Sequence, residues 1–452
     1  MSTRKVIRRK VKQKPSKAAE FSLDTADVEA IALKNDEPSW LLERRLQAWE
    51  SYRAIPMPTL KDEAWRRTDI RSIPSSDLKL ENYASTQVPA ELLLSITDNS
   101  DEARVVLHPG QEPKTQNVAE LQGQGVIFTD WKKAVKEHAA ILETHLGTLV
   151  KDDEGKFSAL TATFADNGII IYVPRGVVVD TPLHSILWAP GSDVVVFSRI
   201  LVILEEGASL TYIHEAASPT IEDGAAVHAG ICELIIGEDA NLHFIETQHW
   251  GNHVWNFTHK AAELARGGHL EWVFGAVGSH LTKNFTELTL AGEGAEARMG
   301  AFYFTDNNQH LDHDTQQNHL APNTTSDLLF KGALRDKSRS VWQGMIYVAP
   351  GAQKTDGYQA NRNLILSPRA RADSIPGLEI LADDVRCTHG ATIGQLDSEQ
   401  VYYLMSRGLS ELQAESLVVD GFFSPVLERI PFEPLRKRFQ GMIDLKMNGG
   451  SA

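Results

Sequence analysis

Short runs of apolar, largely β-branched residues fill the middle of the chain. Runs such as 169–173, 194–197 and 200–204 are rich in Ile and Val and are bounded by turn residues. β-branched residues suit the pleated surface of a strand, and such short bounded runs are typical of strands rather than helices. The pattern therefore predicts a β region over roughly residues 158–395.

The turns of this β region resemble one another. Similar tetrapeptides begin at Gly207, Asp239, Gly267, Gly294 and Gly351, with spacings of 32, 28, 27 and 57 residues. The last spacing is close to two periods. A period near thirty, with strands and no helices between them, predicts a β-solenoid whose coils stack on one another. An ordinary β-sandwich is the alternative, and it would not need the repeat.

Helical patterns flank the β region on its N-terminal side. Residues 20–157 are expected to form a helical and mixed domain. Ser39 is predicted to cap a helix whose apolar residues, from Trp40 to Trp49, share one face, and Pro56 is predicted to end it. A short helix is expected over 63–67 and a longer one over 132–146.

The C-terminal segment, residues 396–452, is predicted to be helical again. Polar N-caps are expected at Asp397, Ser410 and Ser424. The first helix has Gln400 at its third position and Gly408 after its end, and the third would begin with a proline. Three short helices bury little apolar surface among themselves. They are therefore expected either to cap the solenoid or to dock a partner.

Composition places the protein among ordinary globular chains. Hydrophobic residues make up 42% and charged residues 23% of the 452 residues. No apolar run approaches the length that spans a bilayer, and no secretion signal opens the chain. Two cysteines, Cys232 and Cys387, do not make a disulfide framework, so we expect a cytoplasmic location.

The net charge of −15 is unevenly distributed. Residues 1–19 hold eight basic side chains and no acid, so the remainder carries −23. An acidic body of this kind repels phosphate backbones, which argues against nucleic-acid binding. The basic tail is expected to be disordered and solvated, because its composition buries little apolar surface.

The most distinctive chemistry is the pair Cys387 and His389, near the end of the β region. Thiolate and imidazole are suited to soft metal ions, and residues two apart on a strand point to the same face. When only these two residues are considered, the alternative is a structural role, with a buried cysteine beside a histidine whose hydrogen bonds are made within the chain.

A second polar group has the residue types of a metal site and consists of His310, Asp312, His313, Asp314 and His319. Its spacing lacks the regularity of zinc motifs, and polar residues also form ladders between solenoid coils. The remaining histidines His243, His249, His253 and His259 are scattered, and we expect them to be structural or exposed. No phosphate-binding P-loop motif occurs, so any ATP would bind another subunit.

These motifs together resemble the SufB/SufD family of iron–sulfur cluster assembly scaffolds. The densest stretch is RCTHGATIGQLDSEQVYYLMSRGLSELQAESLVVDGFF over 386–423. Upstream, HLDHDTQQNHLAPNTTSDLLFKGALRDKSRSVWQGMIYV over 310–348 and GAQKTDGYQANRNLILSP from Gly351 look like the family's central signatures. The N-terminal EPSWLLERRLQAWESYRAIPMPT, followed by EAWRRTD, is similar to the SufD branch.

Three departures from SufB also favour the SufD branch. Where SufB-like members read histidine-glutamate-alanine-threonine, this chain has a glycine at Gly390. SufB-like members carry a cysteine near the position of Arg362, where this chain has none. An N-terminal cysteine cluster of some SufB proteins is also missing. The resemblance therefore implies that this chain lacks the SufB cysteine thought to hold sulfur.

The resemblance implies a right-handed parallel β-helix flanked by helical regions and a non-enzymatic scaffold role. It implies pairing with a SufB-like paralogue and binding of the ATPase SufC, with self-association of the isolated chain left open. His389 and Cys387 would lie at a SufB–SufD interface, where an iron–sulfur cluster assembles transiently and no cofactor is held stably by this chain alone. SufC would dock on the helical C-terminal region, represented by Asp397, Gln400, Tyr403, Arg407 and Gly408.

Two other functions compete with this interpretation. A β-helix carbohydrate-active enzyme would use carboxylates along one solenoid face, but no acid pair of interpretable spacing occurs. A Cys/His acyl-transfer enzyme would use Cys387 and His389, but no oxyanion motif or orienting acid is apparent.

Overall fold

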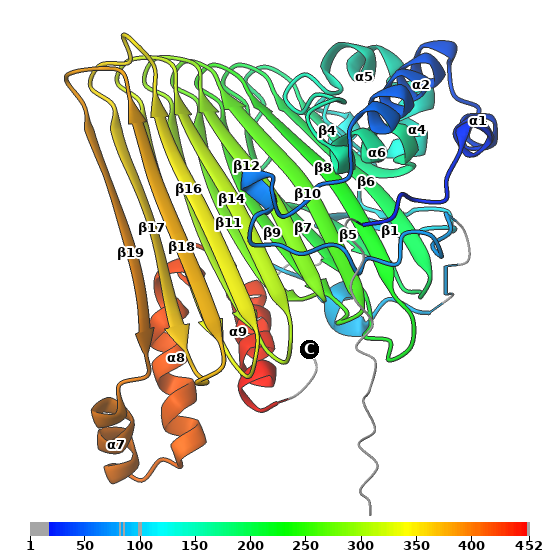
Figure 1. The fold of residues 1–452 in the computed structure, drawn as a ribbon. Coiled ribbons are helices and arrows are strands. Elements are labelled where there is room, and N and C mark those ends of the chain that lie inside the picture. The colour runs from blue at the N-terminus through cyan, green and yellow to red at the C-terminus, as the bar shows by residue number, and fades with distance from the viewer. Residues whose placement is uncertain (1–17, 81–82, 85, 98–101, 450–452) are drawn as a thin grey trace, which may run out of the picture.

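The apolar runs of the middle region form two parallel β-sheets that face each other along the length of the molecule (Figure 1).

The computed structural model describes residues 18–80, 83–84, 86–97 and 102–449. The expected disorder of the basic tail falls almost entirely on residues 1–17, which lie outside this range. Ala18 is buried, and the carbonyl oxygen of Ala19 accepts a hydrogen bond from Ser75 Oγ at 2.6 Å.

Consecutive strands alternate between the two sheets, so each coil of the chain contributes one strand to each. The first sheet contains β4 (Asn167–Val173), β6 (Val194–Leu204), β8 (Ala226–Ile236), β10 (Val254–Leu264), β12 (Leu281–Leu290), β14 (His310–His319), β16 (Arg339–Val348) and β18 (Arg371–Ile380). The second contains β5 (Leu183–Trp188), β7 (Ser209–Ala217), β9 (Asn241–Trp250), β11 (His269–Gly278), β13 (Glu296–Thr305), β15 (Thr325–Leu334), β17 (Asp356–Ile365) and β19 (Arg386–Gln395). We call them the even and the odd sheet.

The repeated turns connect the even sheet to the odd sheet. Their first residues adopt positive φ angles: 68° at Gly207, 51° at Asp239, 63° at Gly267, 72° at Gly294 and 88° at Gly351. This backbone conformation favours Gly, Asp and Asn, which explains why these residues recur in the turns. The turns also hydrogen-bond from coil to coil. The predicted β-solenoid is therefore confirmed, and the sandwich alternative is wrong.

The space between the sheets forms the largest apolar core. Inward-facing side chains from Ala103 to Trp342 make one continuous cluster of buried residues. Because side chains alternate along a strand, the outward-facing residues are left for other elements to cover.

The N-terminal region covers the first coil and the outer face of the even sheet from β4 to β12. It contains α1 (Thr25–Asn35), α2 (Ser39–Ala54), η1 (Glu63–Trp65), η2 (Ala90–Leu93), β1 (Ala103–Leu107), β2 (Lys114–Gln116), α3 (Ala119–Gln122), β3 (Ile127–Asp130), α4 (Trp131–Glu137), α5 (Ala139–His145) and α6 (Lys156–Phe164). β3 pairs with β4 in the even sheet, whereas β1 pairs with β5 and with β2 in the odd sheet. α6 packs against β8, and Phe157 stacks on Phe257 with ring centroids 3.8 Å apart.

Three details of this region differ from the sequence predictions. Ser39 is the first helical residue of α2 and the N-cap is Pro38, which makes no side-chain capping bond. The short helix over 63–67 is a single 3₁₀ turn. The helix expected over 132–146 is interrupted at His138, whose φ of −132° is not helical, so it becomes α4 and α5.

The C-terminal helices are α7 (Ser398–Ser406), α8 (Glu411–Leu427) and α9 (Glu433–Met447). Ser410 and Gln413 form the predicted capping box of α8. Asp397 caps α7 by accepting a bond from Glu399 N at 2.9 Å, rather than through the predicted box with Gln400. The predicted third helix start at Ser424 is wrong, because Pro425 lies inside α8.

The C-terminal helices do not cover the end of the solenoid. The second half of α8 packs against β13 and β15, and α9 packs beside it. Together they cover the outer face of the odd sheet (Figure 1). Their buried residues include Val419, Phe423, Val426, Leu427, Leu435, Phe439 and Ile443. In the described part of the chain, no helix is long and apolar enough to cross a membrane.

Candidate functional site

The last coil of the solenoid, β18 and β19, is uncovered (Figure 1). Within the part of the chain that the structure describes, each strand pairs on one side only, with β16 and β17 respectively. Both strands are ten residues long, so each offers a long row of unpaired backbone groups. Such edges are prone to pair with another chain.

Apolar side chains surround these open edges. The exposed fractions are 37% for Leu378, 38% for Ile380, 52% for Leu381 and 50% for Ile393. Exposed apolar residues that gather at one place are typical of protein–protein interfaces. We call this surface, formed by β18, β19 and Leu381, the open end. These apolar residues were not predicted from the sequence, although the alternating pair Leu378 and Ile380 in the next-to-last strand is a signal that could have identified them.

Cys387 and His389 both lie on β19, at the open end. In the register of the odd sheet, Cys387 pairs with Gly357 and His389 with Gln359. Gln359 is fully buried, and its amide donates to Gly377 O at 2.8 Å. His389 is exposed, because no strand beyond β19 covers it. By the alternation of a strand, both side chains point to the same face.

Cys387 is half-buried and packs against a small apolar cluster that includes Ile346 and Val348. Burial raises the pKa of its thiol, whereas a backbone hydrogen bond from Gly357 acts in the opposite direction. The thiol is therefore protonated near neutral pH in the single chain. A metal ion or a partner's positive charge would be needed to favour the thiolate.

The space beside Gly357 is shared by Cys387 and a second histidine. A Cβ at Gly357 would lie 3.2 Å from Cys387 Sγ and 3.5 Å from His319 Nε2. His319 is fully buried, and its two ring nitrogens lie 2.8 Å from Thr324 Oγ1 and 2.8 Å from Ser326 Oγ. Burial lowers the pKa of His319 to about 4, so the ring is neutral. Both of its nitrogens have polar partners within the chain, which indicates a structural role.

The polar group on β14 does not converge on one site. His310, Asp312 and Asp314 alternate onto the outer face of the even sheet, whereas His313 and His319 point between the sheets. Asp312 and Asp314 hold the buried Lys283 ammonium at 3.0 and 2.9 Å. Desolvation raises the pKa of Asp312, and Lys283 acts against this rise. The outer group is therefore a buried ion-pair network.

Three of the four scattered histidines lie in clearly different environments. His253 lies 2.9 Å from the Gly191 carbonyl oxygen through Nε2, and burial lowers the pKa of His243 to about 4. His259 lies on the outer face of the even sheet, near Glu154.

α7 and the first half of α8 form a helical hairpin, called the C-terminal hairpin, which projects beside the lower end of β19 (Figure 1). Tyr403 is 57% exposed on α7, and its ring lies 5.1 Å from the Arg407 guanidinium, which also donates to the Tyr403 hydroxyl at 3.1 Å. Gln400 is exposed on the same helix. Gly408 ends the helix with a φ of 101°.

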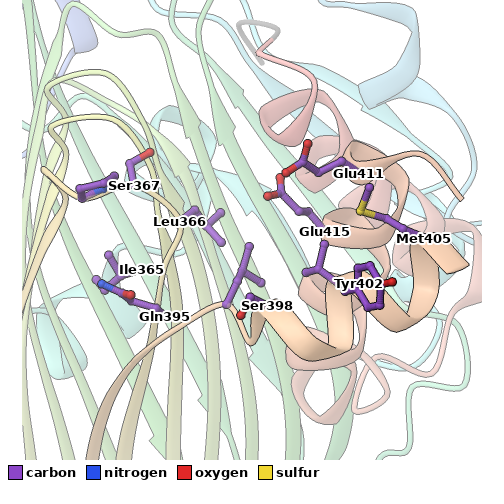
Figure 2. Close-up of a pocket in the computed structure, with 12 residues that line it drawn as sticks. Ile365, Leu366, Ser367, Gln395, Ser398, Tyr402, Met405, Glu411 and Glu415 are labelled. Carbon is purple, nitrogen blue, oxygen red and sulfur yellow. The ribbon is translucent and has the colours of Figure 1, made fainter.

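A groove of about 360 Å³ separates this hairpin from the turns of the last coils (Figure 2). Its lining combines apolar side chains with two carboxylates: Leu366, Val401, Tyr402, Met405, Glu411 and Glu415. A surface of this composition suits a partner segment with both apolar and basic side chains.

Family models match nearly the whole of this architecture. The model described as "SUF system FeS cluster assembly, SufBD core domain" covers residues 187–422, and "SufBD protein N-terminal region" covers residues 27–184. The chain belongs to the SufB/SufD family. The core-domain match spans β6 to β19, α7 and most of α8, so it includes the open end and the hairpin.

Curated relatives agree with this assignment. The chain is 31% identical to the iron–sulfur cluster assembly protein SufD of Bacillus subtilis (strain 168), over 94% of this chain and 98% of the relative. It is 28% identical to SufB of the same organism, over 92% and 91%. A SufBD family protein of Staphylococcus saprophyticus is 29% identical over 90% and 89%. The chain is thus an iron–sulfur cluster assembly protein of this family.

Proposed function

We propose that this chain is the SufD-branch subunit of a Suf-type complex and pairs with a SufB-like paralogue through the open end. The proposal rests on one observation: β18 and β19 each have a free edge, and exposed apolar side chains surround these two edges. A paralogue with the same solenoid could extend both sheets and bury these side chains. The same edges would also allow the isolated chain to pair with a second copy.

An iron–sulfur cluster would be the cargo of this interface. His389 is exposed on the terminal strand, and Cys387 lies two residues away on the same face. Imidazole and thiolate are both ligands for iron, and pairing would place them beside the partner's own residues. The cluster would be held transiently in the complex and would not be a resident cofactor of this chain. We propose that the chain acts as a scaffold without catalysis of its own.

A SufC-type ATPase would dock on α7 and the first half of α8. This surface includes Asp397, Gln400, Tyr403, Arg407 and Gly408, together with the groove beside them. The exposed Tyr402 and Tyr403 are large apolar anchors of the kind that dominate binding energy at interfaces. The family match favours this assembly role over the alternative of a carbohydrate-active β-helix enzyme.

The cluster proposal is tested with His389→Ala in a complex reconstituted anaerobically with the paralogue and the ATPase. We expect iron and sulfide content to fall strongly while the melting temperature stays nearly unchanged, since an exposed side chain contributes within about 0.5 kcal/mol. Thr388→Ala is the matched control, because Thr388 is exposed on the same strand but points to the other face. Normal cluster content with His389→Ala would refute the site assignment.

The docking proposal is tested with Tyr403→Ala. We expect weaker co-purification of the ATPase subunit, with folding and paralogue pairing retained. Leu445→Ala is the control, because Leu445 is 50% exposed on α9, outside the hairpin. Unchanged ATPase binding by Tyr403→Ala together with Tyr402→Ala would exclude this surface.

A further inference from the structure

Three potential metal-ligating side chains converge on the outer face of the even sheet, away from the open end. His259 lies on β10, Glu287 on the neighbouring β12, and Glu154 just before α6. One ligand atom from each lies within 4.8 Å of the other two. This group could not be recognised in the sequence, because its members are 105 and 28 residues apart.

Neighbouring groups hold each of the three side chains in place. His259 Nδ1 lies 3.2 Å from Ser158 Oγ, and His259 Nε2 lies 3.6 Å from Glu154 Oε1. The other oxygen of Glu154 accepts a hydrogen bond from Lys151 N at 3.0 Å. Glu287 Oε1 accepts one from Asn318 Nδ2 at 2.5 Å. Metal ligands are commonly oriented in this way by hydrogen bonds to their second atoms.

The electrostatics of the group favour a bound cation. Desolvation raises the pKa values of both Glu154 and Glu287, and each of these rises is increased by nearby carboxylates. Burial lowers the pKa of His259 to about 4, so the ring is neutral. In the tautomer with hydrogen on Nδ1, that nitrogen donates to Ser158, and the Nε2 lone pair faces the carboxylates. A cation bound between these atoms would offset this convergence of negative and lone-pair density.

We propose that Glu154, His259 and Glu287 form a binding site for one divalent first-row metal ion. One imidazole with two carboxylates suits Mn²⁺, Fe²⁺ or Zn²⁺ better than soft ions, which prefer thiolates. All three residues line a surface cavity of about 640 Å³, so water can complete the coordination and the ion has an entry path.

The bound ion would tie the N-terminal region to the solenoid. Glu154 belongs to the segment that leads into α6, whereas His259 and Glu287 belong to adjacent strands. A shared ion therefore cross-links two parts of the chain that are more than a hundred residues apart. In the even sheet, β14 and β16 separate β12 from the last strand β18, so this site is distinct from Cys387 and His389.

The test uses the full-length purified chain, stripped with a chelator and titrated with Co²⁺. Cobalt is the probe because its visible d–d bands report coordination by nitrogen and oxygen ligands. We expect one equivalent to bind and to raise the melting temperature. His259→Gln and Glu287→Gln should each weaken Co²⁺ binding by at least about tenfold, since each removes or weakens one of three protein ligands.

His269→Gln is the matched control and should bind Co²⁺ like the parent protein. His269 Nδ1 lies 3.7 Å from Glu296 Oε2, so it also has a carboxylate neighbour, but this pair belongs to no group of three metal-ligating side chains among the described residues. The Glu287→Gln variant keeps a side-chain oxygen that can accept the hydrogen bond from Asn318. This variant therefore still tests the proposal if His259→Gln fails to fold.

Unchanged Co²⁺ affinity in folded His259→Gln or folded Glu287→Gln would overturn the proposal. So would thiolate charge-transfer bands that disappear with Cys387→Ser, because they would place the ion at the open end. The readout is metal binding by this chain alone, so its failure leaves the assembly role untouched.

Discussion

Burial of neutral histidines inside the solenoid should make the protein sensitive to mild acid. His313 points between the sheets and is surrounded by aromatic rings, with centroids 5.6 Å from Phe274, 5.4 Å from Tyr303 and 5.7 Å from Phe330. Its Nδ1 lies 3.3 Å from the Asn284 amide. Burial lowers the pKa of His313 to about 3. The ring is therefore neutral in the folded state over the whole ordinary pH range.

The sign and size of the effect follow from the two pKa values. An unfolded histidine titrates near 6.5, so between pH 6.5 and about 3 the unfolded state binds one more proton than the folded state. The contribution of His313 to the free energy of unfolding is therefore complete above pH 6.5, and it decreases as the pH drops below 6.5. Each pH unit costs about 1.4 kcal/mol, so His313 alone should remove about 2 kcal/mol at pH 5.

His313→Phe tests this reasoning, because it removes the titrating group but keeps a ring among the aromatic neighbours. Urea unfolding at pH 5, 6, 7 and 8 gives the free energy of unfolding at each pH. Between pH 8 and pH 5 this free energy should fall by about 2 kcal/mol less in the variant than in the parent protein. Phe330→Leu is the control: it should lower stability at every pH without changing the decline. If the free energy of unfolding falls with pH equally in His313→Phe and in the parent protein, then His313 does not cause the acid sensitivity.

Three further changes probe the fold. Phe439→Ala should lower the free energy of unfolding by about 3–5 kcal/mol, because this fully buried α9 side chain packs 5.7 Å from the Phe302 ring; hydrogen exchange of β13 would report the loss. Gly332→Ala should lower the melting temperature and disturb the odd sheet, because a Cβ there would approach the Tyr303 ring to 2.0 Å. Removal of residues 2–17 should leave the melting temperature and partner binding unchanged, and a loss of either would show that the tail is structural.

The solenoid could be predicted from the sequence because its turns carry a local signal. Each turn from the even to the odd sheet between β6 and β17 contains a residue with positive φ, which Gly, Asp and Asn adopt most readily, so a structural period becomes a visible repeat. The polar group on β14 shows that residue types alone do not predict a site. It must also be known which face of the strand each side chain occupies. His310 and His313 are close in sequence, yet an odd separation places them on opposite faces of the strand.

Helix ends were harder to predict, and Pro425 shows why. A proline after a serine usually indicates a helix start, because the missing N–H costs nothing there. Inside α8 the missing bond would have gone to the carbonyl oxygen of Gly421. That oxygen instead accepts a hydrogen bond from Ser424 Oγ at 3.2 Å. This local compensation allows the helix to continue, and no general sequence rule foresees it.

The placement of the C-terminal helices gives the strongest structural argument for a partner at the open end. At the other end of the solenoid, β2 and β3 pair antiparallel with β1 and β4, so the first coil is covered by the chain itself. At the C-terminal end the chain continues directly into three helices, yet α8 and α9 turn back over the outer face of the odd sheet. Ile393 and Leu381 stay about half exposed although apolar helices are available nearby. Burying them within the chain would stabilise the monomer, so the open end is better explained as a surface that another solenoid covers.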